Sequence, residues 1–164
     1  MFRLSKVSDY GIVVLAHLAR NPVPASRNAR EIAHEVQLPA PMVSKILKSL
    51  ARQGVLESQR GAQGGYQLAR PPEAITVGQM ITILEGPMGL TECALGADLC
   101  THEGSCEVQS SWQLINRVIS DALQRVTLAD LIDPAFDEHL STDDILNRVR
   151  PTRSSSVDER PEPN

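Results

Sequence analysis

Residues 41–68, PMVSKILKSLARQGVLESQRGAQGGYQL, decide the fold of this chain. Apolar residues recur at helical spacing in the first half of the stretch and predict a helix over 41–53, which Gly54 ends. The inward positions are Val43, Ile46, Leu47 and Leu50. The outer face of the same helix carries Ser44, Lys45, Lys48 and Arg52. A basic, hydroxyl-bearing face suits the major groove of DNA, although the solvated face of an ordinary helix has the same composition.

The second half of the stretch has the pattern of a β-hairpin. Segments 55–58 and 66–69 read as short strands, and a glycine-rich turn that carries Arg60 joins them. Glycines let the tip of a hairpin lie close to a groove without side-chain collisions. Arg60 suits a narrow minor groove, where negative potential is concentrated. A nucleotide-binding loop is excluded because neither G-x-x-x-x-G-K-[ST] nor G-x-G-x-x-G occurs here and the glycines stand between two strands.

Upstream of this stretch, the apolar spacing predicts two more helices. One begins at a cap formed by Ser8 or Asp9, and the other covers about 28–36. Helices joined by a tight turn and followed by a hairpin are typical of a winged helix-turn-helix domain, whose second helix enters the DNA major groove. We therefore predict DNA contacts at Ser44, Lys45, Lys48, Arg52, Arg60, Gly61, Gly64 and Gly65.

The distribution of charge favours a polyanionic partner for the first half of the chain only. Residues 1–72 hold ten Lys or Arg and four acids, a net charge of +6, whereas residues 73–164 hold six Arg and sixteen acids, a net charge of −10. Chance clustering on solvated faces is the alternative explanation. No apolar run approaches the roughly 18 residues of a membrane span, and no secretory signal is recognisable, so we expect a cytoplasmic protein without a membrane partner.

Beyond the hairpin we expect helices over about 75–84, 105–125 and 128–132. The longest helix has a heptad seam, formed by Val108, Trp112, Ile115, Ile119, Ala122 and Val126. This seam favours a homodimer, because so small a chain has little core with which to cover it, although packing within one chain uses the same kind of face.

The predicted fold is therefore mostly α with a small β wing. It consists of a winged helix-turn-helix DNA-binding domain at 1–72, a region at 73–133 with a helix, a cysteine segment (88–106) and a long dimerisation helix, and an acidic, largely disordered tail at 134–164.

All three cysteines lie in the glycine-containing segment before the long helix, at Cys93, Cys100 and Cys106. Their odd number and a cytoplasmic setting argue against a structural disulfide, and thiolates on one loop suit a soft metal. The gaps of six and five residues are longer than those of most zinc sites, which favours an iron–sulfur cluster over zinc with His102 as a fourth ligand. A metal-free redox thiol is the third alternative.

The surroundings of the cysteines add two expectations. Cys106 stands at the start of the predicted long helix, whose dipole would stabilise a thiolate there. No nucleophile motif surrounds any cysteine, so we do not expect an enzyme or a small-molecule substrate.

Residues 3–11 (RLSKVSDYG), residues 60–68 (RGAQGGYQL), the three cysteines and the long helix together resemble the Rrf2 family of bacterial winged-helix transcription regulators. The resemblance covers residues 1 to about 133 and is greatest to the IscR-like regulators of the Suf iron–sulfur assembly operon. It implies a homodimer that binds double-stranded operator DNA and holds an iron–sulfur cluster, 2Fe–2S, on the three cysteines. It also implies repression of the assembly genes when clusters are plentiful.

Two features of the sequence depart from the family pattern. The best-known cluster site has a histidine three residues after the third cysteine, where this chain has Gln109. In the nitric-oxide sensors of the family, an acidic residue in the partner's first helix is a ligand, and Asp9 stands at the corresponding place. Ser44 and Lys45 replace a Glu–Gln pair, so the base preference is not carried over. The resemblance also allows a nitric-oxide or redox sensor, and the residues alone allow a DNA-binding protein with structural zinc.

Overall fold

The computed structural model describes residues 3–21, 26–61, 64–96, 99–101 and 105–135. Within them the chain forms seven α-helices, a two-stranded antiparallel sheet and one 3₁₀ turn, so the mostly helical fold with a small wing is confirmed. The elements are α1 (Lys6–Arg20), α2 (Ala29–Glu35), α3 (Ala40–Arg52), β1 (Leu56–Gln59), β2 (Gly65–Leu68), the 3₁₀ turn (Pro72–Ala74), α4 (Val77–Glu85), α5 (Glu92–Leu95), α6 (Gln109–Arg125) and α7 (Leu128–Ile132). The predictions for His102 and for the tail beyond 135 lie outside the described residues.

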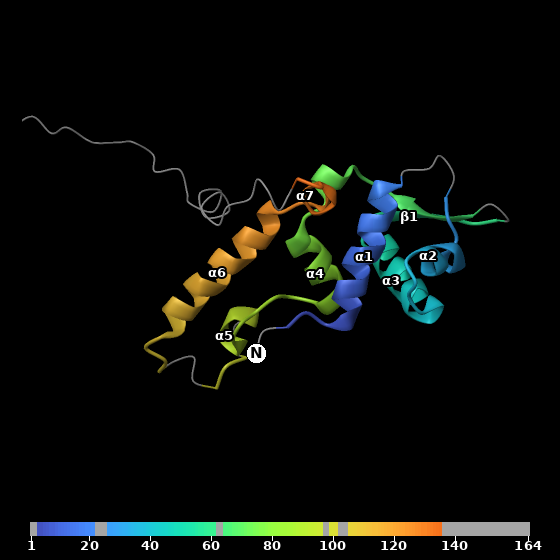
Figure 1. The fold of residues 1–164 in the computed structure, drawn as a ribbon. Coiled ribbons are helices and arrows are strands. Elements are labelled where there is room, and N and C mark those ends of the chain that lie inside the picture. The colour runs from blue at the N-terminus through green and yellow to red at the C-terminus, as the bar shows by residue number, and fades with distance from the viewer. Residues whose placement is uncertain (1–2, 22–25, 62–63, 97–98, 102–104, 136–164) are drawn as a thin grey trace, which may run out of the picture.

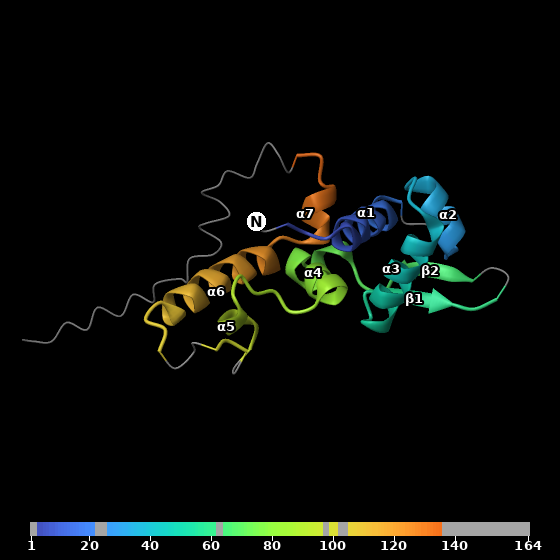
Figure 2. The same ribbon diagram turned by 90° about the horizontal axis from the view of Figure 1, so that it is seen from below.

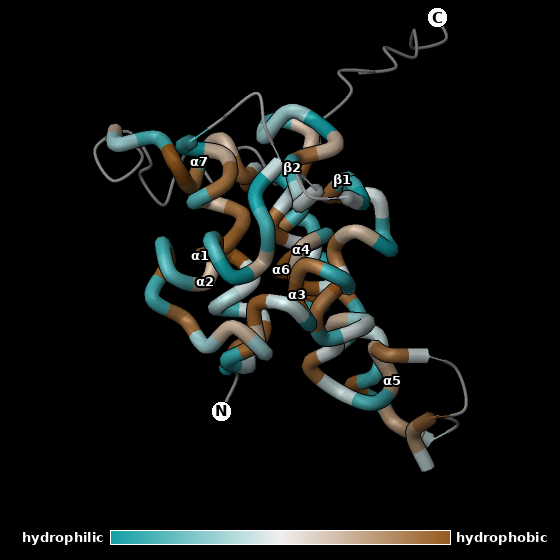
Figure 3. The backbone as a smooth tube through the Cα atoms, turned by 90° about the vertical axis from the view of Figure 1, so that its right-hand side faces the viewer, coloured by the Kyte–Doolittle hydropathy of each residue, from teal (hydrophilic) through white to brown (hydrophobic). Residues whose placement is uncertain are grey.

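The hydrophobic core lies beneath α3. The four apolar residues expected to point inward from this helix are fully buried, and α3 packs against α1, α2 and α4. In Figure 3 the hydrophobic stretches, drawn in brown, gather around α3 and α4 in the middle of the view. Burial of one face leaves the opposite face of α3 in solvent, which is where the predicted DNA-contacting side chains stand.

Helix α2 is fixed at both of its ends. Asn28 begins α2 with a capping box, because its side chain accepts hydrogen bonds from the backbone amides of Arg30 and Glu31 while the Glu31 carboxylate accepts from the Asn28 amide. After α2, Gln37 adopts a left-handed conformation with φ of 54°, and the Leu38 amide donates to the carbonyl of Ala33 at 3.0 Å. The contacts at Gln37 and Leu38 shape the turn through which α3 leaves α2.

Two predicted helix starts are wrong. Ser5 caps α1, accepting from the Ser8 amide at 3.3 Å, whereas Ser8 is buried inside the helix and Asp9 lies in its first turn. Three polar residues, Ser5, Ser8 and Asp9, have the chemistry of a cap, and the helix continues back to the earliest of them. The long helix begins at Gln109 and not at 105, with no side-chain hydrogen bond at its cap.

The hairpin forms as predicted, with each strand displaced by one residue. Leu56 pairs with Leu68 and Gln59 with Gly65, and the glycine-rich turn connects the two strands beyond this last pair. The base of the hairpin joins the core through Leu56, which is 2% exposed. The remaining residues of β1 are exposed, so the hairpin projects from the domain as a wing (Figure 1).

Helix α6 extends away from the helix-turn-helix and the hairpin. Figures 1 and 2 both show α5 and α6 at one end of the molecule and α2 with the hairpin at the other, with α4 between them. The end of α6 is anchored, because the Val77 amide donates to the Val126 carbonyl at 2.8 Å and Thr76 Oγ1 donates to Gln124 Oε1 at 2.6 Å. Among the described residues no helix combines the length and apolar character that a bilayer crossing requires.

Candidate DNA-binding surface and cysteine segment

The outer face of α3 presents most of the predicted contacts. Lys45, Lys48 and Arg52 are exposed, and Ser44 is half-buried at the edge of the same face. Residues four apart on a helix lie one turn apart, so Ser44, Lys48 and Arg52 form a row along α3. A row of hydroxyl and cationic donors with this spacing can contact base edges and the flanking phosphates of a major groove.

The tip of the wing depends on three glycines in three different ways. Gly61 has φ of +115°, a backbone conformation that favours glycine. A Cβ on Gly64 would overlap the carbonyl oxygen of Gln59, and one on Gly65 would overlap the backbone of Arg27. Arg60, at the end of β1, is exposed beside this turn. The wing therefore offers the cation of Arg60 next to a turn in which the described residues 61, 64 and 65 are all glycine.

A network at the base of the wing joins three elements. The Arg27 carbonyl accepts from the Tyr66 amide of β2 at 2.8 Å, and the Arg27 guanidinium donates to Glu35 Oε2 of α2 at 2.8 Å. His17 of α1 lies with Nε2 at 2.7 Å from the same carboxylate oxygen. The hydrogen bond from His17, followed by the charge of Arg27, lowers the pKa of Glu35 below its ordinary value of 4.5.

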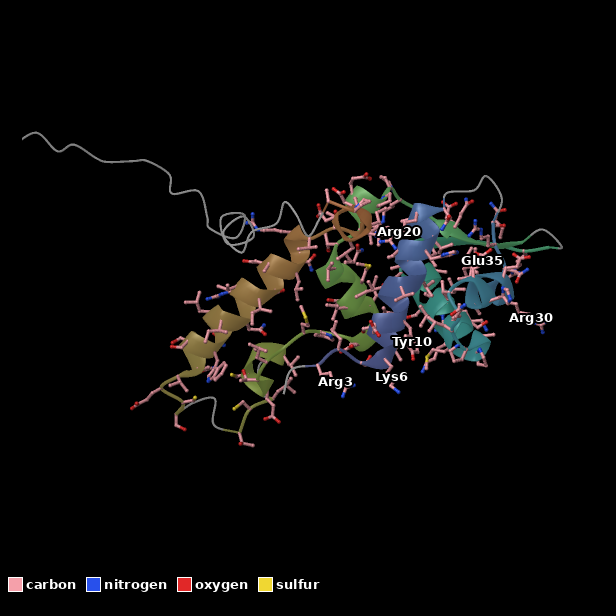
Figure 4. The ribbon with its side chains drawn as sticks, viewed as in Figure 1. Arg3, Lys6, Tyr10, Arg20, Arg30 and Glu35 are labelled. Atoms are coloured by element: carbon pink, nitrogen blue, oxygen red, sulfur yellow. The ribbon has the colours of Figure 1, made fainter. Side chains whose placement is uncertain are left out.

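Two further cations lie at the start of α1, and the sequence analysis did not select them. Arg3 and Lys6 are exposed there, as Figure 4 shows. Neither belongs to the helix-turn-helix or to the wing, and only the net charge of the first half of the chain pointed to them.

Cys93 lies on α5, a short helix that the sequence analysis did not predict. Its Sγ is 3.1 Å from Thr91 Oγ1, and it lines a cavity of about 330 Å³ between α5 and α6. The other residues that line this cavity are Ala94, Leu95, Gly96, Gln113, Asn116 and Arg117. Cys100 and Cys106 are also partly exposed, and none of the three forms a disulfide.

The cysteine segment rests on one face of α6. Asn116 Oδ1 accepts a hydrogen bond from the Leu90 amide at 3.1 Å, and its Nδ2 donates to the Met88 carbonyl at 3.5 Å. The Asn116 side chain thus satisfies one backbone amide and one backbone carbonyl of the segment before α5, which has no regular secondary structure there. The start of the cysteine segment is therefore fixed to α6 by a side chain outside the cysteine pattern.

The predicted ligands are not brought together. Among the described residues no three His, Cys, Asp or Glu side chains form a group that could hold a metal ion. Cys106 precedes the first residue of α6 by three positions, so it does not occupy the helix N-terminus expected for it. Asp9 is exposed in the first turn of α1. Soft, partly exposed thiols that are free of disulfides match iron or zinc in their chemistry. The described part of the chain does not bring them together into a site.

The side of α6 that faces away from the cysteine segment is apolar and exposed. Its large apolar residues have exposed fractions between 40% and 55%: Val108, Trp112, Leu114, Ile115 and Val118. Of the predicted seam, Ile119, Ala122 and Val126 are half-buried near the anchored end of the helix. Among the residues that the structure describes, none covers the first half of the seam.

Comparison with known proteins agrees with this arrangement. The model of the Rrf2 family, described as an iron-dependent transcriptional regulator, matches residues 4–134. A Synechocystis sp. protein named as an HTH-type transcriptional regulator is 32% identical over 134 residues, which are 79% of this chain and 86% of that protein.

Two solved structures have the same fold. The chain is similar to CymR of B. subtilis, named the global cysteine regulator, with a TM-score of 0.62 and 29% identity, covering 80% of this chain and 97% of that one. It is similar to T. potens IscR with a TM-score of 0.61 and 29% identity, covering 85% and 93%. The family model spans the helix-turn-helix, the wing, the cysteine segment and α6, and the chain therefore belongs to the Rrf2 family of transcriptional regulators.

Proposed function

We propose that this protein is a homodimeric repressor that binds operator DNA through α3 and the wing and responds to an iron–sulfur cluster held by its cysteines. The observation that carries the DNA-binding part is the row of Ser44, Lys48 and Arg52 on the solvent face of α3, with Arg60 on a hairpin beside it. Lys45, Lys48 and Arg52 contact phosphates or bases. Ser44 contacts a base edge or a phosphate, and Arg60 enters the minor groove. A protein that binds operator DNA in a bacterium acts in the cytoplasm, and this is the localisation that the proposal implies.

Selection from a random duplex pool, followed by anisotropy titrations at several salt concentrations, tests this binding mode. Lys48→Ala weakens binding to every duplex about equally and reduces the log–log salt slope by about one. Arg60→Ala also relaxes the base preference at the position that the wing contacts. Glu73→Ala, a change at an exposed acid outside both elements, is the control and leaves affinity within about twofold. Unchanged affinity in Lys48→Ala and Arg60→Ala would contradict the proposed surface.

The homodimer forms through the exposed apolar face of α6. A chain in water does not keep five large apolar side chains, from Val108 to Val118, half-exposed on one helix without a partner surface. Two copies related by a two-fold axis cover the same face on each other and set the spacing of the two α3 helices. That spacing determines which pairs of half-sites the dimer binds.

The three thiols hold a 2Fe–2S cluster. This part is supported by the chemistry of the donor set, three free cysteines within fourteen positions. It is also supported by the description of the family as iron-dependent regulators and by the similarity to T. potens IscR. When bound, the cluster supplies a soft, redox-active centre that binds thiolates. Because the described ligands are apart, Cys93, Cys100 and Cys106 must approach one another, with Asp9 of the partner's α1 as the candidate fourth ligand.

Anaerobic purification followed by iron, sulfide and zinc analysis tests the cluster. We expect near-equal amounts of iron and sulfide in the wild-type protein. Cys93→Ser should lose both, whereas Asp9→Ala should retain a less stable cluster. About one zinc per chain without sulfide would replace the cluster by structural zinc and remove sensing. The regulated genes are those of iron–sulfur cluster assembly, and in vivo mapping of bound promoters tests that assignment.

A further inference from the structure

Arg27 connects the wing to the helix-turn-helix by two different parts of the same residue. Its backbone forms an antiparallel bridge with Tyr66, in which the Tyr66 amide donates to Arg27 at 2.8 Å and the Arg27 amide donates back at 3.3 Å. This bridge occupies the edge of β2 that does not pair with β1. The position of β2, and with it the wing, therefore depends on where residue 27 is held.

The side chain of Arg27 is held by a carboxylate of α2. Its Nη1 lies 2.8 Å from Glu35 Oε2, and the side chains of Arg27 and Glu35 are 19% and 38% exposed. Figure 4 shows Glu35 on α2, near the end of α1 marked by Arg20. The turn between α2 and α3 fixes these two helices to each other. The position of Arg27, which binds Glu35 of α2, is therefore coupled to the position of α3.

His17 completes the network from α1. Its Nε2 is 2.7 Å from Glu35 Oε2 and 3.0 Å from Arg27 Nη1. In the tautomer with a proton on Nε2, His17 donates to the carboxylate, and Arg27 Nη1 donates to the same oxygen and not to His17. Glu35 Oε2 thus accepts hydrogen bonds from His17 and Arg27 at once. This single oxygen links α1, α2 and the base of the wing.

At Gly65 the backbone of β2 lies against the backbone of Arg27. A Cβ at Gly65 would overlap the carbonyl group of Arg27, so the backbones of β2 and of residue 27 are already in contact. A wing that pivots about its base must therefore break the two backbone hydrogen bonds between Arg27 and Tyr66 or move Arg27 away from Glu35.

From these contacts we propose that Arg27 is a positioning residue for DNA recognition. It does not need to touch DNA; through Glu35 and the Tyr66 bridge it fixes the wing relative to α3, so that Arg60 meets its groove while Lys48 meets its own. The proposal rests on the DNA-binding mode above, and it distinguishes Arg27 from Arg30. Arg30 has a similar charge three residues further on, and its side chain has no hydrogen bond or ion pair with the part of the chain that the structure describes.

The first test needs no DNA. Amide hydrogen exchange of the full chain is compared for wild type, Arg27→Met and the matched control Arg30→Met. Arg27→Met raises exchange at the Tyr66 amide about fivefold, the effect of losing an exposed ion pair worth about 1 kcal/mol. Exchange at the Val55 amide, which donates to Leu50 at 3.0 Å within the core, stays at the wild-type rate. Unchanged exchange at Tyr66, or an equal rise at Val55, overturns the proposal.

The second test is a double-mutant cycle on the duplex selected by wild-type protein. Arg60→Ala costs less affinity in the Arg27→Met background than in wild type, by about threefold or more, because the wing is already misplaced. Arg27→Lys, which keeps a cation for Glu35, restores most of the difference. Additive losses would mean that Arg27 and Arg60 act independently, which contradicts the proposal. If no variant binds any duplex, the proposed DNA-binding function fails, and the exchange test still decides the role of Arg27.

Discussion

Replacing Ile115 by aspartate should convert the dimer to a monomer without unfolding the chain. Ile115 is 44% exposed and does not belong to the hydrophobic core. Full burial of an isoleucine contributes about 1.5–3 kcal/mol, so covering the exposed part contributes about 1 kcal/mol in each subunit and about 2 kcal/mol in a symmetric dimer. Burying two aspartates adds a penalty of at least a few kcal/mol. The dimer dissociation constant should therefore rise by about a thousandfold or more.

Sedimentation equilibrium over a wide concentration range measures this change, and circular dichroism measures the stability of the fold. Ser110→Asp is the matched control, because Ser110 is exposed on α6 and stands about 140° around the helix from Ile115. The control should stay dimeric. An Ile115→Asp protein that dimerises as strongly as wild type would show that α6 does not form the interface. A protein that loses its helical signal would show that Ile115 supports the fold of a single chain.

The remaining predictions concern the fold and the site. Ile46→Ala, at a fully buried position of α3, should lower the free energy of unfolding by about 2–5 kcal/mol in a urea titration, whereas Lys45→Ala should change it by less than about 0.5 kcal/mol. Gly65→Ala should break the bridge between Arg27 and Tyr66 and cost about 1–3 kcal/mol, and retention of Tyr66 amide protection would be inconsistent with that overlap. Hydrogen bonding from His17, and then the charge of Arg27, lowers the pKa of Glu35 in the folded state. The ionised Glu35 should therefore stabilise the fold fully above pH 4.5, its ordinary pKa, and this stabilisation should disappear as the pH falls through the lower pKa of the folded state. Glu35→Gln should remove this part of the acid dependence of unfolding. Cys93→Ser should leave the thermal midpoint of the metal-free protein unchanged within about 2 °C, since Cys93 is only partly buried on α5, and a large fall would assign it a structural role.

Periodic features were predictable from the sequence, and long-range features were not. The helix over 41–53 and the two strands were found within one residue of their predicted ends, because helical spacing, Gly54 and the glycine-rich turn act locally. The start of α1 was wrong by about one turn, since Ser5, Ser8 and Asp9 have the same capping chemistry. The contact between Arg27 and Tyr66 joins residues 39 positions apart and leaves no pattern in a single sequence.

The cysteine segment shows the limit of spacing as evidence. C-x6-C-x5-C and the absence of a disulfide indicated thiol chemistry, and the structure describes three free thiols. The short helix α5 and the role of Asn116 were missed, because a four-residue helix and a single asparagine have no periodicity to detect. Whether the α6 seam packs within one chain or between two was open in the sequence, and exposed fractions of 40% for Trp112 and 44% for Ile115 favour the second.

Operator affinity measured with and without the cluster tests the proposed regulator most directly. Anaerobically purified protein, with its iron and sulfide determined, is titrated against the selected duplex before and after removal of iron by a chelator. We predict that the two affinities differ by about tenfold or more and that Cys93→Ser abolishes the difference. Superimposable isotherms for the cluster-containing and iron-free dimers would contradict cluster sensing, while leaving DNA binding through α3 and the wing in place.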